Sequence, residues 1–176
     1  MVYSGNIYLI GPMGAGKTTV GRRLAESRGM QFADSDQEVE ARSGVDIAFI
    51  FEKEGEAGFR RRERLAIAEL TQRNNLVLAT GGGAVLDPDS RRLLAARGFV
   101  VYLHASIDQQ VARTDRADTR PLLQSGNRRE TLERLLGIRD PLYREIADLV
   151  LHTDGRNARA LAREIEDHLA AGPDAG

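Results

Sequence analysis

Short apolar runs recur along the chain, and helical spacing follows each of them. The apolar runs have the length of buried strands and lie at residues 7–10, 76–79, 99–103 and 149–151, with a weaker one at 31–33. Spacing typical of amphipathic helices is found at residues 22–28, 46–54, 59–73, 87–97, 107–113, 129–147 and 157–170. This alternation predicts an α/β fold with a parallel sheet of about five strands, covered by helices on both faces.

The segment after the first apolar run carries the strongest motif. Ligands of such sheets bind beyond the carboxyl ends of the strands, and residues 11–18, which read GPMGAGKT, match the phosphate-binding P-loop there. A glycine-rich turn between strand and helix is the structural alternative. Lys17 favours the functional interpretation, because the chain has 25 basic residues, only two of them are lysines, and one stands where a slim point charge is needed.

The P-loop predicts a nucleotide site with a metal ion. Its glycines let successive backbone N–H groups face a phosphate, and the start of the next helix adds positive potential. Lys17 is expected to reach the β and γ phosphates of ATP, and the hydroxyl of Thr18 to hold Mg²⁺. The predicted ATP contacts in this segment are Gly14, Ala15, Gly16, Lys17, Thr18 and Thr19.

Two carboxylates follow the weak apolar run at residues 31–33. Asp34 and Asp36 are expected at the carboxyl edge of the sheet, beside the P-loop. A structural role is equally open, because Ser35 and Glu38 have the spacing of a capping box and Asp36 could cap the helix that follows.

Two further segments lie near the same predicted edge. Gly81, Gly82 and Gly83 follow the run at residues 76–79, and three glycines there favour close approach of a ligand to the backbone over a simple turn. Residues 55–63 read GEAGFRRRE, which taken alone is typical of a solvated, charged helix start.

One polar stretch interrupts the alternation of strands and helices. Residues 114–127 contain Arg116, Arg120 and Pro121, and predict either a long surface loop or a lid. The chain is expected to form a single domain over residues 1–176, with a frayed tail at about 172–176.

Composition narrows the possible partners. The 25 basic and 26 acidic side chains give a net charge of −1, so neither nucleic acid nor an anionic membrane is an expected partner. The chain has no cysteine and three scattered histidines, so no zinc site is expected. No apolar run is long enough to span a bilayer, and residues 1–10 lack the pattern of a signal peptide, so a cytoplasmic location is expected.

Together these segments resemble the shikimate kinase family. The resemblance rests on the P-loop, on residues 34–36, 55–63 and 80–83, on RPLL at 120–123 and on RDPLY at 139–143, in the order and spacing of the family, and it covers about residues 5–170. It implies the P-loop kinase fold and an ATP-dependent phosphotransferase. The implied enzyme transfers the γ-phosphoryl of ATP to the 3-hydroxyl of shikimate, giving shikimate 3-phosphate and ADP, a step of chorismate and aromatic amino-acid biosynthesis.

The resemblance also implies roles for individual residues on the shikimate side. Asp36 corresponds to the residue that contacts substrate hydroxyls, and Arg60 and Arg139 to the pair that clamps the carboxylate. Glu63 corresponds to the acid that orients the substrate-binding arginine. Gly82, with its neighbours Gly81 and Gly83, would offer backbone to the substrate.

On the nucleotide side, the implied roles extend beyond the P-loop. Asp34 resembles the residue that supports Mg²⁺ through water, and Arg120 the lid arginine that closes on the phosphates. Arg113, Arg156 and Asn157 resemble positions that flank the adenine. The implied catalytic residues are Lys17, Asp36 and Arg120. Arg120 could alternatively be a solvated loop residue. The expected partners are ATP and shikimate, and a monomer is expected.

Two other classes of protein share the P-loop. A kinase for gluconate or a nucleoside monophosphate would not need the combination of Asp36, Arg60 and Arg139. A nucleotide-dependent switch would bind ATP without an acceptor. No segment of the sequence resembles the switch regions of that class.

Overall fold

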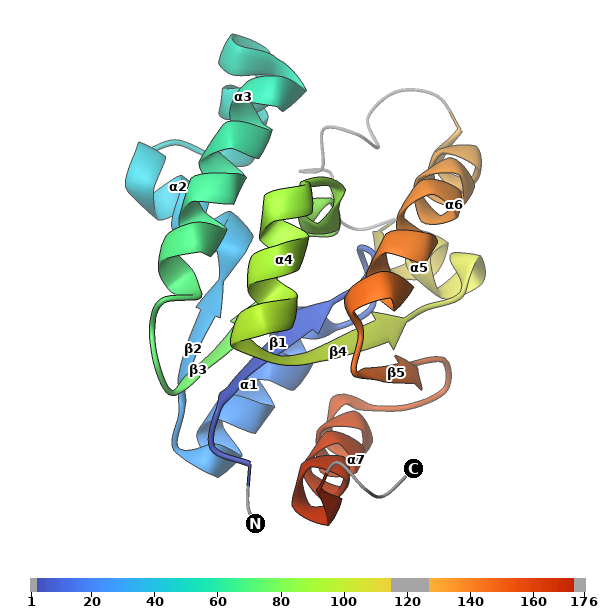
Figure 1. The fold of residues 1–176 in the computed structure, drawn as a ribbon. Coiled ribbons are helices and arrows are strands. Elements are labelled where there is room, and N and C mark those ends of the chain that lie inside the picture. Colours follow the sequence, from blue (N-terminus) through green and yellow to red (C-terminus); the bar gives the residue numbers. More distant parts are fainter. Residues whose placement is uncertain (1–2, 115–126, 173–176) are drawn as a thin grey trace.

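The computed structural model describes residues 3–114 and 127–172, and its centre is one five-stranded sheet (Figure 1). The strands are β1 (Asn6–Ile10), β2 (Gln31–Asp34), β3 (Leu76–Ala79), β4 (Gly98–His104) and β5 (Leu149–His152). They lie in the order β2, β3, β1, β4, β5, and every neighbouring pair is parallel. The predicted α/β fold is confirmed.

Helices cover both faces of this sheet. They are α1 (Lys17–Arg28), α2 (Ser35–Ser43), α3 (Ile47–Leu70), the 3₁₀ turn η1 (Ala84–Leu86), α4 (Pro88–Arg97), α5 (Ile107–Thr114), α6 (Arg128–Ile146) and α7 (Ala158–Ala171). Helices α1 and α7 lie together on one face, and α3, α4 and α6 lie on the other (Figure 1). Within the described ranges, no helix has both the length and the apolar character needed to cross a bilayer.

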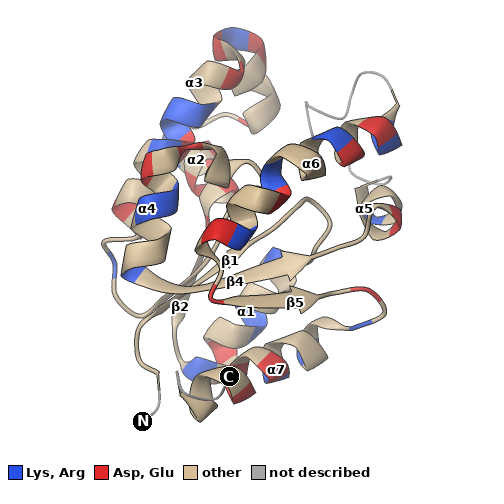
Figure 2. Ribbon diagram, turned by 45° about the vertical axis from the view of Figure 1, so that its right-hand side comes forward, with Lys and Arg blue, Asp and Glu red and all other residues tan. Residues whose placement is uncertain are grey.

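Alternate strand residues supply the two halves of the core. Ile7 and Leu9 of β1 pack with α1 and α7, whereas Tyr8 and Ile10 pack with α3, α4 and α6. Because both faces are buried, the strands read as continuous apolar runs instead of alternating ones. Asp34 is the only charged residue within the five strands, and it stands at the carboxyl end of β2. Figure 2 shows that most of the other charged residues lie on the helices. A charged residue at the end of a buried strand is therefore a stronger indication of a functional site than a charged residue on a helix surface.

Three helix predictions differ from the structure. The helices expected at residues 46–54 and 59–73 are one element, α3, which is kinked where Gly55 adopts φ 72° and ψ −178°. The helix expected from residue 22 begins five residues earlier, at Lys17, because α1 starts directly at the end of the P-loop. Helix α2 is a separate element between β2 and α3 that the apolar spacing did not delimit.

Sheet order places the segments with chemical motifs side by side. Strand β1 lies between β3 and β4, and Leu9 is paired with Ala79 on one side and Val101 on the other. The P-loop follows β1, and the segment from Thr80 to Gly83 follows the neighbouring β3. Asp34 ends β2, directly opposite Ala79 at the end of β3. Three consecutive strand ends thus carry the candidate residues, at the edge where ligands of parallel sheets bind.

Candidate active site

The P-loop is shaped by glycines with positive φ. Gly14 and Gly16 have φ of 80° and 91°, a region that other residues rarely adopt. Gly16 is also the N-cap of α1, and it makes no side-chain capping bond. The first-turn N–H groups of α1 are therefore left for an anion at the mouth of the loop, where the helix dipole favours negative charge.

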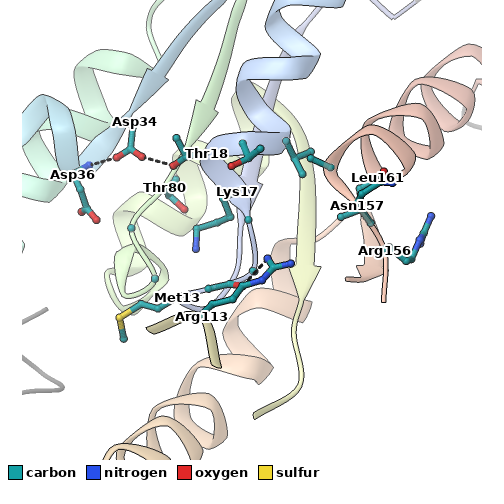
Figure 3. Close-up of a pocket in the computed structure, with 18 of the residues that line it drawn as sticks. Met13, Lys17, Thr18, Asp34, Asp36, Thr80, Arg113, Arg156, Asn157 and Leu161 are labelled. Atoms are coloured by element: carbon teal, nitrogen blue, oxygen red, sulfur yellow. Dashed lines mark hydrogen bonds between the residues drawn. The ribbon is translucent and has the colours of Figure 1, made fainter. Parts of the chain in front are cut away.

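Lys17 lies across the inside of this loop (Figure 3). Its ammonium donates hydrogen bonds to the carbonyls of Gly11 and Pro12, at 2.6 and 2.8 Å. These contacts hold the charge within the curl of the loop, on the side that faces the cavity. Because the ammonium is already held beside the cavity, it can neutralise phosphate oxygens without a large movement of the side chain.

The loop forms one wall of a cavity of about 760 Å³. The other walls come from the ends of β2 and β3 and from helices α5 and α7. The lining residues are Met13, Gly14, Ala15, Gly16, Lys17, Thr18, Thr19, Val20, Asp34, Asp36, Thr80, Gly81, Gly82, Ala112, Arg113, Arg156, Asn157, Ala158 and Leu161. A cavity of this size holds a ligand of nucleotide dimensions.

Asp34 connects the P-loop helix to the next helix. One carboxylate oxygen accepts a hydrogen bond from Thr18 Oγ1 at 2.8 Å, and the other accepts from the backbone N–H groups of Asp36 and Gln37 at 2.9 and 3.2 Å. Asp34 is therefore the N-cap of α2. The alternative in which Asp36 caps this helix is wrong.

The proposed capping box does not form either. Ser35 is fully buried, and its hydroxyl oxygen accepts a hydrogen bond from the N–H of Gly81 at 2.9 Å. The carboxylate of Glu38 instead accepts from Arg42 on the surface of α2. With capping assigned to Asp34, Asp36 presents its carboxylate at the cavity beside Gly81 (Figure 3).

The donors around Asp34 fit a magnesium ion. Thr18 Oγ1 and the Asp34 carboxylate are adjacent oxygen donors, the ligands that Mg²⁺ prefers. In the described part of the chain, no group of three or more acidic, histidine or cysteine side chains is arranged to hold a metal ion. A protein site with few carboxylates is the usual arrangement when phosphates of the substrate complete the coordination.

A second group of charged side chains adjoins Asp36. Arg60 and Glu63 of α3 form an ion pair at 2.9 Å, and Arg139 of α6 lies next to them. Glu63 is 3% exposed and Arg139 is 4% exposed. Burial raises the pKa of Glu63 to about 7, partly opposed by the charge of Arg60, and burial lowers the pKa of Arg139. Both shifts show that water no longer stabilises these charges.

The glycine triplet separates this charged group from the P-loop. A Cβ atom on Gly81 would lie 2.6 Å from Asp36 Oδ1, and one on Gly83 would lie 2.4 Å from Arg60 Nη2. At Gly82 the nearest atom is Arg139 Nη1, at 3.4 Å. At Gly81 and Gly83 the missing side chains therefore make room for charged groups of the protein itself, and the close approach of a ligand that the sequence suggested stays a prediction.

Two further walls of the cavity are formed by α5 and by the start of α7. Arg113 donates a hydrogen bond to the carbonyl of Gly14 at 3.0 Å, so it lies against the P-loop. Asn157 caps α7 by accepting from Ala160 N–H, and Arg156 pairs with Glu164. Arg156 and Asn157 face the P-loop across the cavity, whereas Arg113 lies beside the loop (Figure 3).

Comparison with known proteins agrees with this geometry. The model for the family described as shikimate kinase matches residues 13–170 of the chain. The chain belongs to the shikimate kinase family. Shikimate kinase of Shewanella loihica is 56% identical over 164 residues, which cover 93% of this chain and 96% of that protein.

Solved shikimate kinases share the whole fold. The structure from Acinetobacter baumannii in complex with shikimate is 52% identical, with a TM-score of 0.95, and the match covers 97% of this chain and 96% of that one. The structure from Aquifex aeolicus is 32% identical, with a TM-score of 0.85 and coverage of 97% and 99%. The P-loop kinase fold expected from the resemblance is thus confirmed.

Most of the site residues predicted from the sequence lie at or beside one cavity. It is lined by residues 14–19, Asp34, Asp36, Gly81, Gly82, Arg113, Arg156 and Asn157. Arg60, Glu63, Gly83 and Arg139 lie beside it. Arg120 and residues 115–126 lie outside the described ranges, so the lid and its arginine stay predictions. Sequence reasoning missed Ser35 and Tyr143 as supports of the glycine triplet, since a buried hydroxyl leaves no local pattern.

The pKa of Glu63 predicts how stability varies with pH. In the folded protein this pKa is about 7, compared with an ordinary value of 4.5, so the folded state binds the proton more tightly. The resulting stability is present below pH 4.5 and is lost as the pH rises to about 7, by on the order of 3 kcal/mol. The side chain in Glu63→Gln stays neutral at every pH. In this variant the free energy of unfolding, measured in urea, should therefore not show this decrease between pH 5 and pH 8.

A matched control is Glu56→Gln. Glu56 also pairs with Arg60, but its side chain is 49% exposed. This variant should retain the pH dependence of the unaltered protein. The assignment fails if Glu63→Gln loses as much stability between the two pH values as the unaltered protein.

Proposed function

We propose that this chain transfers the γ-phosphoryl of ATP to the 3-hydroxyl of shikimate. The proposal rests mainly on one observation: the cavity at the P-loop adjoins a group of two arginines and two carboxylates, of which Glu63 and Arg139 are buried. The first half fits a triphosphate, and the second fits a small acid with hydroxyl groups. A relative that is 52% identical, from Acinetobacter baumannii, was solved in complex with shikimate.

The nucleotide half acts by positioning and by neutralising charge. Phosphoryl transfer needs little covalent chemistry from the protein. Lys17 and the N–H groups at the start of α1 would hold the β and γ phosphates. Arg113, Arg156 and Asn157 would contact the nucleoside, since they line the same cavity outside the P-loop. Thr18 and Asp34 would hold Mg²⁺, which supplies positive charge at the phosphate oxygens.

The acceptor half would recognise shikimate by its charge and its hydroxyls. Arg60 and Arg139 present planar guanidinium groups, which can bind a carboxylate through paired hydrogen bonds. Asp36 would orient the reacting hydroxyl and receive its proton late, because a loose transition state needs no strong base. Glu63 fixes Arg60 through the 2.9 Å ion pair and limits the repulsion between the two arginines.

A coupled ADP-release assay tests the proposed function. ADP release should depend on shikimate, and gluconate or a nucleoside monophosphate should not replace it. Turnover with gluconate or a nucleoside monophosphate would instead indicate a different small-molecule kinase. ATP binding without stimulation by any acceptor would indicate a nucleotide-dependent switch.

Asp36→Asn should separate acceptor chemistry from structure. Because Asp34 caps α2, removal of the Asp36 charge should leave the melting temperature unchanged while kcat falls by about 100-fold or more. Asp89→Asn is the control, since Asp89 also lies in the first turn of a helix, on the exposed surface of α4. Normal turnover of Asp36→Asn would remove Asp36 from the site.

Arg139→Lys should weaken shikimate binding. A lysine keeps the charge but cannot form the paired hydrogen bonds, so the dissociation constant for shikimate should rise by about tenfold to 100-fold, with the KM for ATP unchanged. Arg144→Lys on the same helix changes an exposed ion pair with Asp140 and should have no effect. Equal shikimate affinity in calorimetry of Arg139→Lys and the unaltered protein would contradict the carboxylate clamp.

A further inference from the structure

We propose that Ser35 and Tyr143 are positioning residues that hold the Gly81–Gly83 turn in the form that receives shikimate. The inference rests on the proposed function and extends it to two buried hydroxyls. They reach the turn from opposite sides, Ser35 from the start of α2 and Tyr143 from α6.

Tyr143 holds the carbonyl side of the turn. Its side chain is fully buried, and its hydroxyl donates a hydrogen bond to the carbonyl of Gly82. Burial raises the pKa of this hydroxyl, which keeps it protonated as a donor. The ring packs against Tyr102 with 4.7 Å between centroids, and Tyr102 in turn donates to Asp140 at 2.7 Å. The position of the hydroxyl is thus fixed by packing on β4 and by α6.

Ser35 holds the amide side of the same turn. Its oxygen accepts from Gly81 N–H at 2.9 Å, and the side chain is 0% exposed. Asp34 and Asp36 flank it in the sequence, so the serine links the turn to the segment that carries both carboxylates. A displacement of the turn would therefore change its position relative to Asp36.

The other N–H and carbonyl groups of the turn, which Ser35 and Tyr143 do not contact, determine what a ligand could bind. The carbonyls of Gly81 and Gly83 accept from Ala84 and Leu86, at 3.1 and 3.0 Å. In the described part of the chain, the N–H of Gly82 has no acceptor, and Gly82 lines the cavity. An oxygen of the substrate that reaches Gly82 thus finds a backbone donor without an internal competitor.

Ser35 and Tyr143 also determine the position of the turn relative to Arg60 and Arg139. Arg139 and Tyr143 lie one helical turn apart on α6, so the guanidinium and the hydroxyl reach the triplet together. A Cβ atom on Gly83 would collide with Arg60, and one on Gly82 would be in van der Waals contact with Arg139 Nη1, at 3.4 Å. Small shifts of the turn must therefore move the arginines that would bind the carboxylate.

The experiment compares Tyr143→Phe and Ser35→Ala with Tyr8→Phe. Tyr8 is the matched control, because it is also fully buried and its hydroxyl also donates to a backbone carbonyl, that of Arg97. In Tyr143→Phe the Gly82 carbonyl loses its donor, so the KM for shikimate should rise by about tenfold while the KM for ATP stays the same. Ser35→Ala should act in the same direction, and Tyr8→Phe should change neither KM.

The pair of KM values distinguishes positioning from a purely structural role. A lower melting temperature with an unchanged KM for shikimate in Tyr143→Phe and Ser35→Ala would overturn the inference. Equal increases in the KM for shikimate and the KM for ATP would also overturn it. Ser35→Ala tests the turn independently if Tyr143→Phe does not fold. Absence of shikimate-dependent turnover in the unaltered protein would instead contradict the proposed function, and the inference with it.

Discussion

The burial of Arg139 and Glu63 is the constraint on which the acceptor half depends. A buried charge is costly unless it is paired, and removal of one partner leaves the other without compensation. Glu63 is paired with Arg60, but burial still raises its pKa, and burial lowers the pKa of Arg139 by more than its acidic neighbours raise it. A bound carboxylate would supply the charge that this arginine lacks. The cost of burial is therefore offset in the complex, which favours an anionic acceptor over a neutral one.

Tertiary structure brings this group together from distant parts of the chain. Arg60 and Glu63 come from α3, and Arg139 comes from α6, which lies on the same face of the sheet (Figure 1). The glycine triplet after β3 fills the space between these helices and the P-loop. Since β3 is hydrogen-bonded to β1, the triplet and the P-loop have a fixed separation. The acceptor half is thus located relative to the phosphates by the sheet itself.

How much could be predicted from the sequence depends on how far apart along the chain the interacting residues lie. The P-loop and the strands were predictable because apolar runs buried on two faces, and a loop that continues directly into a helix, are local patterns. The cap of α2 was not, since the choice between Asp34 and Asp36 depends on how β2 ends. Ser35 and Tyr143 act on residues 46 and 61 positions away, a distance over which spacing carries no information. Residue roles came mainly from the family resemblance.

Two kinds of glycine serve the two halves of the site. Gly14 and Gly16 have positive φ, so a side chain there would strain the backbone that curls around a phosphate. Gly81 and Gly83 lack positive φ, and a side chain there would collide with Asp36 and Arg60. Substitution should therefore act on nucleotide binding in the first case and on the acceptor group in the second. The same residue type is required by backbone geometry at the phosphates, and by the close packing of charged side chains at the acceptor.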